Sequence, residues 1–288
     1  VEMKSVNKNT KLNERFRSSE SVEKASLDEI KFNYLYDDEV DYHFMNPKSF
    51  EQINIKKEIV VDDDLSQLIL TSADIQDGDI LVIAQKIISK QEGRIVKLST
   101  VTPSLLAEGI SSQYNKDPNI VELILSESKR IIRMKNGLII VETNHGFICA
   151  NAGIDESNVT DGFATLLPLN SDKSAELIRT KILNETGKNV AIIISDTFGR
   201  PFRMGQTNYA IGISGLNPIL DYAGTLDSFK RILRITAIAI ADELSSAAEL
   251  VMEKTKKCPV AIIRDYSFHV EERPIVDLIL LKIEVLFK

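Results

Sequence analysis

The sequence lacks long apolar runs and contains only two cysteines among its 288 residues. A membrane-spanning helix needs about 20 consecutive, mainly apolar residues, so no transmembrane segment is expected. The N-terminus also lacks the apolar core of a secretory signal peptide. Cys149 and Cys258 lie far apart, without metal-ligand spacing, and are expected to be buried thiols rather than a disulfide. These absences predict a cytoplasmic protein with no membrane partner.

The chain also lacks an excess of basic residues. Its net charge is -7, and no basic stripe offsets this balance, which argues against a nucleic-acid partner. Hydrophobic residues make up 43% of the chain and charged residues 27%, with no low-complexity tract. This length and composition allow one large domain or two small ones.

Residues 1–50 are polar, mixed in charge and without a sustained apolar period. We therefore predict an N-terminal extension over residues 1–50, of which the first 30 are flexible. The main domain is predicted over residues 51–288.

Caps and prolines mark the expected helix starts. Asp64 is expected to cap a short helix through its side chain. Pro103 and Pro118 are expected at the first positions of the next two helices. Asp172 is expected to cap a further helix that ends before Gly187.

Apolar runs and one turn mark the expected strands. Residues 80–84 and 190–194 are short apolar runs, and the second is rich in β-branched residues, which favours a strand buried on both faces. Asn136-Gly137 between two β-rich runs predicts a hairpin. Residues 230–254 show a long helical pattern whose alanines permit close packing.

Two acids, Asp155 and Asp196, each follow an apolar run and lead into a polar, glycine-bearing segment. A carboxylate at a strand end is typical of a hydrogen-bonded structural acid or of a ligand for a hard cation. The segment after Asp196 supplies glycines and anion-binding side chains: Thr197, Gly199, Arg200, Arg203, Gly205 and Gln206. Acids for a metal beside arginines for an anion indicate metal-bound polyphosphate. An ion-pair network that closes a loop explains the spacing equally well.

A second polar group follows the strand predicted at residues 80–84. It contains Gln85, Lys86, Ser89 and Lys90. The two lysines can bind phosphates as point charges, although lysines near a strand end are usually solvated.

Longer motifs carry a resemblance to a known family. The segments are DGDILVIAQKIISKQEGR, HGFICANAGIDESNV, LLPLNSDKSAELIR, IIISDTFGRPFRMGQTNYAIGISG and ADELSSAAELVMEK. In this order they resemble the coenzyme F420:L-glutamate ligase family, the gamma-glutamyl ligases of coenzyme F420 biosynthesis. Residues 1–50 have no counterpart in that pattern.

The resemblance implies a GTP-dependent ligase that joins L-glutamate to the carboxylate of a deazaflavin coenzyme precursor through an acyl phosphate. It also implies Mg²⁺ or Mn²⁺, two divalent ions in all, with K⁺ as a further candidate ion. The implied fold is α+β, with mixed sheets, packed helices and a two-lobed subunit in a homodimer.

The resemblance also assigns roles to individual residues. Asp155 and Asp196 would bind metal and Thr197 a second ion, while Arg200 and Arg203 complete the catalytic set. The residues implied to hold nucleotide are Gln85, Lys86, Lys90, Asn158, Met252, Glu253 and Lys254. The chemistry needs no protein nucleophile, and the sequence shows no convincing Ser/His or Cys/His set.

The chain departs from the family pattern at three glycine positions, which here are Lys230, Glu253 and Asp265. Glu253 places a negative side chain in the implied nucleotide loop. Two alternatives therefore stay open. One is a gamma-glutamyl ligase acting on another phosphorylated carboxylate, and the other is a nucleotide-binding homologue without turnover.

Overall fold

The structure is a computed structural model that describes residues 2–4, 11–13, 33–37, 41–45, 52–56, 64–271 and 273–279. The chain divides into two compact units, Val1–Glu58 and Ile59–Lys288. In the first unit, β1 (Glu2–Lys4) pairs antiparallel with β2 (Lys11–Asn13). A separate antiparallel sheet has the order β3-β4-β5, formed by Asn33–Asp37, Asp41–Met45 and Gln52–Lys56. The predicted flexibility of residues 1–30 falls mostly outside the described residues.

The second unit is organised around a four-stranded sheet of order β13-β12-β6-β16. Its strands are Gln206–Ser214, Ala191–Gly199, Ile80–Ala84 and Val260–Ile263, in that order. β12 runs parallel to β6, whereas β13 and β16 are antiparallel to their neighbours. The sheet is therefore mixed, and the fold is α+β, as predicted.

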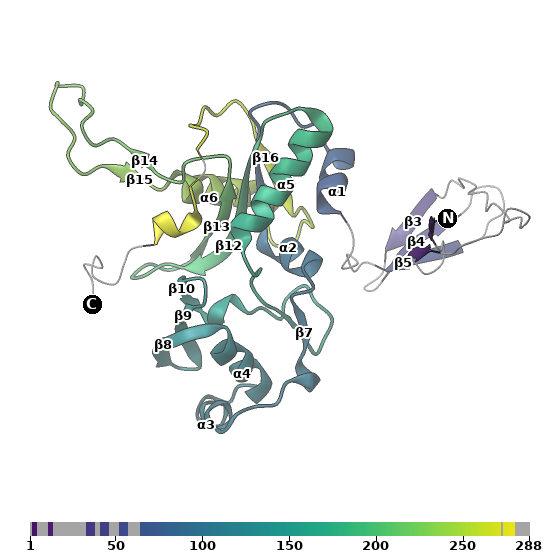
Figure 1. Cartoon of the computed structure of the whole chain (residues 1–288). Helices are drawn as coiled ribbons and strands as arrows, with labels where there is room; N and C mark the ends of the chain where they lie inside the picture. The colour runs from purple at the N-terminus through teal and green to yellow at the C-terminus, as the bar shows by residue number, and fades with distance from the viewer. Residues whose placement is uncertain are drawn as a thin grey trace, which may run out of the picture. The chain divides into compact units, whose positions relative to one another are not determined.

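Helices cover both faces of this sheet (Figure 1). The apolar residues of α1 (Leu65–Ser72), α2 (Gln85–Gln91) and α5 (Ser171–Thr186) share one buried cluster with alternate residues of β6 and β12. The opposite face packs on α6 (Ile240–Met252) and on a short 3₁₀ helix, η3 (Ile275–Leu278). Burial on both faces explains why β12 begins as a continuous apolar run.

A third buried cluster lies below the sheet in Figure 1. It contains α3 (Leu105–Tyr114), α4 (Pro118–Ser126) and the antiparallel sheet β10-β9-β8. These strands are Ile148–Ala150, Leu138–Thr143 and Ser128–Lys135. β7 (Ile95–Lys97) pairs with β11 (Phe163–Thr165), and the 3₁₀ turns η1 and η2 span Leu98–Thr100 and Asn151–Gly153.

Several local predictions are confirmed. Asp64 caps α1 by accepting the N–H groups of Ser66 and Gln67, and Asp117 caps α4 with Pro118 at its first position. Asn136-Gly137 joins β8 to β9. The strand glycine Gly212 lies so close to α5 that a Cβ atom there would overlap Ser171.

Two predicted helix starts are wrong. Ser104 caps α3, so Pro103 lies outside the helix instead of at its first position. Asn170 caps α5, while Asp172 lies in its first turn. The Asp172 carboxylate instead accepts the backbone N–H groups of Ile213 and Ile275, and so ties α5 to β13 and η3. A side chain with a distant backbone partner cannot be distinguished from a cap by sequence alone.

The long helix predicted over residues 230–254 is also wrong in its first half. The helix begins at Ile240, and residues 219–239 form an extended arm closed by β14 (Leu220–Asp221) and β15 (Ala237–Ile238). The arm projects from the body in Figure 1. Ile235 on this arm is 92% exposed.

The structure describes both cysteines and allows a search for membrane-spanning helices. Cys149 is a buried free thiol, as expected, but Cys258 is exposed. No helix within the described part of the chain is long and apolar enough to cross a membrane.

Candidate functional site

Asp196 and Thr197 lie within β12 rather than in a loop after it, which corrects the predicted position of the strand end. The strand continues to Gly199, where it is paired with β13. A bulge between Ile194 and Ser195 interrupts the ladder just before the acid. Such bulges re-aim the side chains that follow. Beyond the bulge, Asp196 lies opposite Tyr209 and Thr197 lies opposite Asn208.

Asp155 reaches the site from the segment that follows η2, where its backbone forms a bridge with Thr165. Its side chain is 40% exposed and makes an ion pair of 2.6 Å with the ammonium of Lys86. Its second oxygen accepts the N–H of Ser157 at 2.7 Å. Burial opposes ionisation, but these contacts outweigh it, and the pKa of Asp155 lies below its ordinary value.

Asp196 has the opposite electrostatic setting. Burial raises its pKa to about 6, although the N–H of Thr197 and the charges of Lys254 and Lys86 act against the rise. Repulsion from the Asp155 carboxylate raises it further. Asp196 therefore interacts electrostatically with Asp155, Lys86 and Lys254.

A hydrogen-bond network holds Thr197. Its Oγ1 donates to Oδ1 of Asn208 at 2.7 Å and accepts from Nζ of Lys254 at 2.8 Å. Nδ2 of the buried Asn208 donates to the Glu249 carboxylate at 3.1 Å. Sequence reasoning assigned neither Asn208 nor Glu249 to the site. The only available signal was that Asn208 follows the RMGQ motif by two residues.

The residues implied to bind nucleotide differ in their burial and in their hydrogen-bond partners. Lys90 donates through Nζ to the backbone oxygen of Asn158 at 2.9 Å, so these two residues lie together near Lys86. The side chain of Gln85 is buried, and its amide nitrogen donates to Ser89 and to the Leu166 carbonyl. Gln85 thus connects α2 to the backbone at Leu166.

The end of α6 supplies the rest of that set. The Met252 side chain is buried in the core, so only its backbone is available to a ligand. Glu253 ends the helix with φ 42° and ψ 152°, and its carboxylate pairs with Lys256 at 2.7 Å. Lys230 and Asp265 also have positive φ, 64° and 60°. All three positions at which the family pattern has glycine therefore have a backbone conformation that favours glycine.

The two arginines of the predicted catalytic set lie in the turn between β12 and β13. Nη2 of Arg200 donates to the carbonyl of Met204 at 2.6 Å, whereas its buried Nε has no hydrogen-bond partner among the described residues. Arg203 is exposed on the same turn. Arg200 thus shapes the turn, and Arg203 is accessible to a ligand.

Aromatic rings lie on the Asp196 side of the hairpin. Phe198 stacks on Tyr209 with ring centroids 5.8 Å apart, and Phe147 lies 6.1 Å from Phe198. His145 contacts the Leu169 carbonyl through Nε2 at 3.2 Å. Burial, with repulsion from Asp196, raises the pKa of Cys149 to about 12, so this thiol is a poor nucleophile.

The donor chemistry fits a hard divalent cation. Asp155, Asp196 and Thr197 offer oxygen ligands only, which suit Mg²⁺ or Mn²⁺ better than softer metals. The raised pKa of Asp196 is that of a buried carboxylate whose charge is incompletely compensated by the protein. Within the described residues, no cluster of three or more His, Cys, Asp or Glu side chains could hold a metal by itself, so a bound ion would need additional ligands.

Comparisons with known proteins find the same ligase family that the motifs resemble. The family model described as F420-0:Gamma-glutamyl ligase matches residues 54–265. The coenzyme F420:L-glutamate ligase of Methanothermobacter thermautotrophicus is 50% identical over 212 residues, which cover 72% of this chain and 84% of the relative. The enzyme of the same name from Methanocaldococcus jannaschii is 47% identical over 218 residues, covering 75% and 83%.

The N-terminal unit matches a different family. The model described as Elongation factor P (EF-P) OB domain matches residues 27–65, which contain β3, β4 and β5. The ligase model begins within this range, at residue 54, and covers nearly three quarters of the 288 residues. The chain therefore belongs to the F420-0:gamma-glutamyl ligase family.

Proposed function

We propose that this chain is a GTP-dependent ligase that joins L-glutamate to the carboxylate of a deazaflavin coenzyme F420 precursor. The relatives named above are coenzyme F420:L-glutamate ligases, which supports the glutamate and the acceptor. GTP is proposed from the family resemblance. The observation that carries the proposal is the convergence of Asp155, Asp196 and Thr197 with Lys86 and Lys254.

A carboxylate is a poor electrophile, so it must be activated before an amine can attack it. Activation by phosphoryl transfer requires positive charge around the phosphates. Lys86 and Lys90 extend from one helix and Lys254 from the loop after another, so ammonium groups approach from two directions. Arg203 adds a planar donor fork suited to a phosphate or carboxylate. Asp155 and Asp196 would hold a divalent ion, which would supply positive charge to offset that of the phosphates.

The three lysines and Arg203 hold and orient the anionic groups, whose positioning supplies much of the catalysis in phosphoryl transfer. The Asp155 carboxylate also positions Lys86, since the two form an ion pair. The aromatic rings beside Asp196 limit the access of water to that face, which strengthens electrostatic interactions there.

The alternative of a homologue without turnover rested on Glu253. That alternative depends on an uncompensated negative charge in the implied nucleotide loop, but the Glu253 carboxylate pairs with Lys256. Its negative charge is therefore partly compensated. The conformation that glycine would adopt is still present at this position.

The direct test is mass spectrometry after incubation of the protein with precursor, L-glutamate, GTP and Mn²⁺. A product heavier by one or more glutamate residues supports the proposal. Omission of GTP, and replacement of GTP by ATP, are the matched controls. GTP hydrolysis without a glutamate-containing product would favour a different acceptor, and neither product nor hydrolysis would favour the homologue without turnover.

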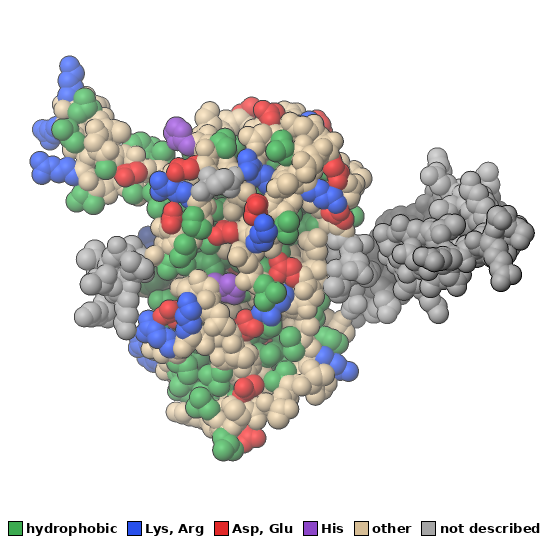
Figure 2. Space-filling view, in the orientation of Figure 1, with side chains coloured by type: hydrophobic (Ala, Val, Ile, Leu, Met, Phe, Trp, Pro, Cys, Tyr) green, Lys and Arg blue, Asp and Glu red, His purple; other side chains and the backbone are tan. Residues whose placement is uncertain are grey.

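We also propose that the subunit is two-lobed and forms a homodimer through the arm of residues 219–239. Figure 2 shows hydrophobic and basic side chains together on this arm, at the upper left. Phe229 is 80% exposed and Ile235 92%. Such large apolar side chains are typical of an interface. The arm also carries Lys230, Arg231 and Arg234.

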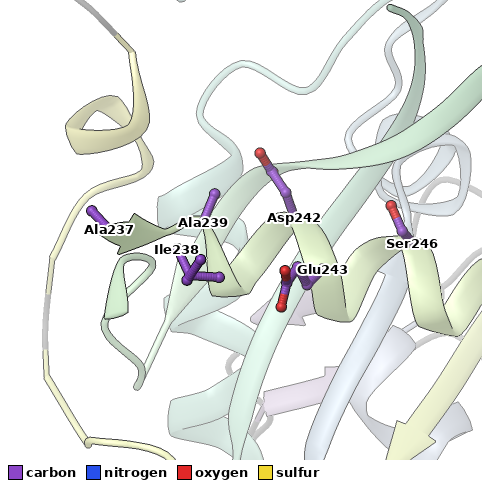
Figure 3. A pocket seen from close by; sticks show the side chains of 6 residues that line it. All are labelled: Ala237, Ile238, Ala239, Asp242, Glu243 and Ser246. Carbon is purple, nitrogen blue, oxygen red and sulfur yellow. The ribbon is translucent and has the colours of Figure 1, made fainter. Parts of the chain in front are cut away.

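An acidic hollow near the base of the arm is a suitable surface for the arm of a second copy. It has a volume of about 390 Å³, and Figure 3 shows Asp242, Glu243 and Ser246 on α6 beside Ala237 and Ala239. Its negative charge complements the basic residues of the arm. The hollow does not contain the candidate active-site residues.

Light scattering should give about twice the 32.2 kDa chain mass. Replacing Phe229 and Ile235 together by Asp should give a monomer, because charges would be buried in the interface. Leu177→Asp is the control, since Leu177 is also exposed, at 59%, but lies on α5. A parent protein that is monomeric and still turns over would overturn the dimer proposal.

A further inference from the structure

The hydroxyl of Thr197 has only one possible orientation in its network. Glu249 accepts a hydrogen bond from Asn208, and a carboxylate can only accept, so Asn208 must direct its amide nitrogen to Glu249. Its amide oxygen is then directed to Thr197, whose proton it accepts. The Thr197 oxygen consequently presents only lone pairs to the site.

A lysine ammonium already uses one of those lone pairs. Nζ of Lys254 lies 2.8 Å from Oγ1 of Thr197, the separation of a charge-assisted hydrogen bond. Its charge also counteracts the cost of burying the Asp196 carboxylate. Lys254 therefore supplies the positive charge beside Thr197 and Asp196 that a bound cation would otherwise supply.

The path of the chain after α6 accounts for the position of Lys254. The helix ends at Met252, and Glu253 has φ 42° and ψ 152°, which turns the backbone out of the helical path. Lys254 is the next residue, and its side chain reaches Thr197 in β12, 57 positions away in the sequence.

The candidate ion position at Asp155 and Asp196 carries more negative charge than the position at Thr197. Lys86 also contacts a candidate ligand there, Asp155. That position has two carboxylates, Asp155 and Asp196, which can attract a divalent ion strongly enough to displace a single ammonium. Thr197 is neutral, and the nearby Glu249 already accepts a hydrogen bond from Asn208. A second divalent ion would have to replace Lys254 without gaining an unshared carboxylate.

We propose that the Lys254 ammonium replaces the second divalent ion at Thr197, so that this chain uses one divalent ion together with one fixed lysine charge. This inference rests on the proposed metal- and nucleotide-dependent function. It departs from the two ions that the family resemblance implies. Lys254 is accordingly a positioning group for phosphate oxygens beside Thr197.

Equilibrium dialysis against Mn²⁺ and GTP, without precursor or glutamate, counts the bound ions per chain. The parent should bind one Mn²⁺. Lys254→Glu supplies a carboxylate beside Thr197 and should bind two. Lys256→Glu, an exposed lysine two residues further along, should remain at one. Circular dichroism of both variants checks that they are folded.

The outcomes separate this inference from the proposed function. Two ions in the parent would overturn the inference and leave the metal-dependent ligase intact. One ion in both the parent and a folded Lys254→Glu variant would overturn the placement of Lys254 at an ion position. No Mn²⁺ binding by the parent would overturn the proposed metal site, and the inference with it.

Discussion

The two candidate metal ligands are carboxylates of one site, but their surroundings differ. Asp155 is 40% exposed and pairs with Lys86, and its pKa is below the ordinary value. Asp196 lies in a strand covered by other elements, and burial raises its pKa to about 6. Contacts with Lys86 and Ser157 outweigh the cost of burying the Asp155 charge, whereas the Thr197 N–H and the two lysines only partly offset that cost for Asp196.

The difference indicates which acid depends more on a bound cation. A carboxylate that is costly to ionise in the free protein gains most when a metal binds, because the metal removes the cost. Asp196 is therefore expected to dominate metal affinity. Asp155 is expected to contribute a second ligand and to position Lys86.

The largest expected effect is that of Asp196→Asn. The variant keeps the shape of the side chain but removes the charge, so turnover should fall by about 1,000-fold or more. The metal-free protein should become more stable, by about 1–3 kcal/mol at neutral pH, because no buried charge remains. Calorimetric Mn²⁺ titration, turnover and thermal unfolding measure the three effects.

Arg203→Lys is the control for that experiment. It keeps the positive charge but loses the planar fork, so turnover should fall while Mn²⁺ affinity stays at the parent value. An Asp196→Asn protein that binds Mn²⁺ and turns over like the parent would show that Asp196 is only a structural acid.

Asp155→Asn should have a smaller effect and the opposite sign in stability. Turnover should fall by about 100-fold, because one anionic ligand is lost while Asp196 remains. The metal-free protein should lose up to about 1 kcal/mol, since a partly exposed ion pair with Lys86 contributes little. Stabilisation of the metal-free protein by this substitution would contradict the proposed difference between the two acids.

The pH dependence of stability should separate the acids further. The native pKa of Asp196 is raised to about 6, so its contribution is fully present below about pH 4 and lost as pH rises through 6. The pKa of Asp155 is lowered, so its contribution is present above about pH 4 and lost as pH falls below that value. Thermal unfolding of the metal-free protein between pH 3 and 8 measures both.

The pKa values of Asp172 and Asp242 are also raised, so these two acids also change the stability of the parent with pH. Variants are therefore needed to isolate the contributions of Asp155 and Asp196. Asp196→Asn should remove part of the loss of stability between about pH 4 and 6, and Asp155→Asn should remove less of it, because it abolishes only the repulsion between the two carboxylates. With Mn²⁺ present, the parent should gain stability as pH rises through 6, because the ion binds the ionised form. A parent curve that Asp196→Asn leaves unchanged would refute the raised pKa.

Sequence reasoning predicted the elements whose signals are local. The cap at Asp64, the hairpin at Asn136-Gly137 and the apolar run of β12 each depend on neighbouring residues or on a short period. The family resemblance also implied that Asp155, Asp196, Lys86 and Lys254 belong to one site, and Asp196 interacts electrostatically with the other three. The binding roles of these residues stay predictions.

The wrong predictions involve side chains or segments whose partners are distant in the sequence. Asp172 resembles a cap but bonds the backbones of Ile213 and Ile275. Residues 230–239 have helical periodicity, yet they form an arm on which Ile235 is 92% exposed. The contact of Lys254 with Thr197 spans 57 positions, and no local pattern predicts it.

The two lysines that accompany the acids are also positioned differently. Lys86 lies on α2, a regular helix that begins directly at the end of β6. Lys254 follows Glu253, a non-glycine residue with φ 42° and ψ 152°. Such a conformation costs a residue with a Cβ atom about 1–3 kcal/mol.

The smallest expected effect is therefore that of Glu253→Gly. Glycine removes the strain but increases the entropy of the unfolded chain by up to about 1 kcal/mol, so a net stabilisation of about 1 kcal/mol is expected. Lys254 keeps its path to Thr197, and turnover should stay within about twofold of the parent. Thermal unfolding and steady-state kinetics measure the two effects, with Glu243→Gly, inside α6, as a destabilised control. Loss of stability in Glu253→Gly would show that the ion pair of Glu253 with Lys256, rather than its strained backbone, determines the contribution of this residue. The proposed difference in how the two lysines are positioned would then be wrong.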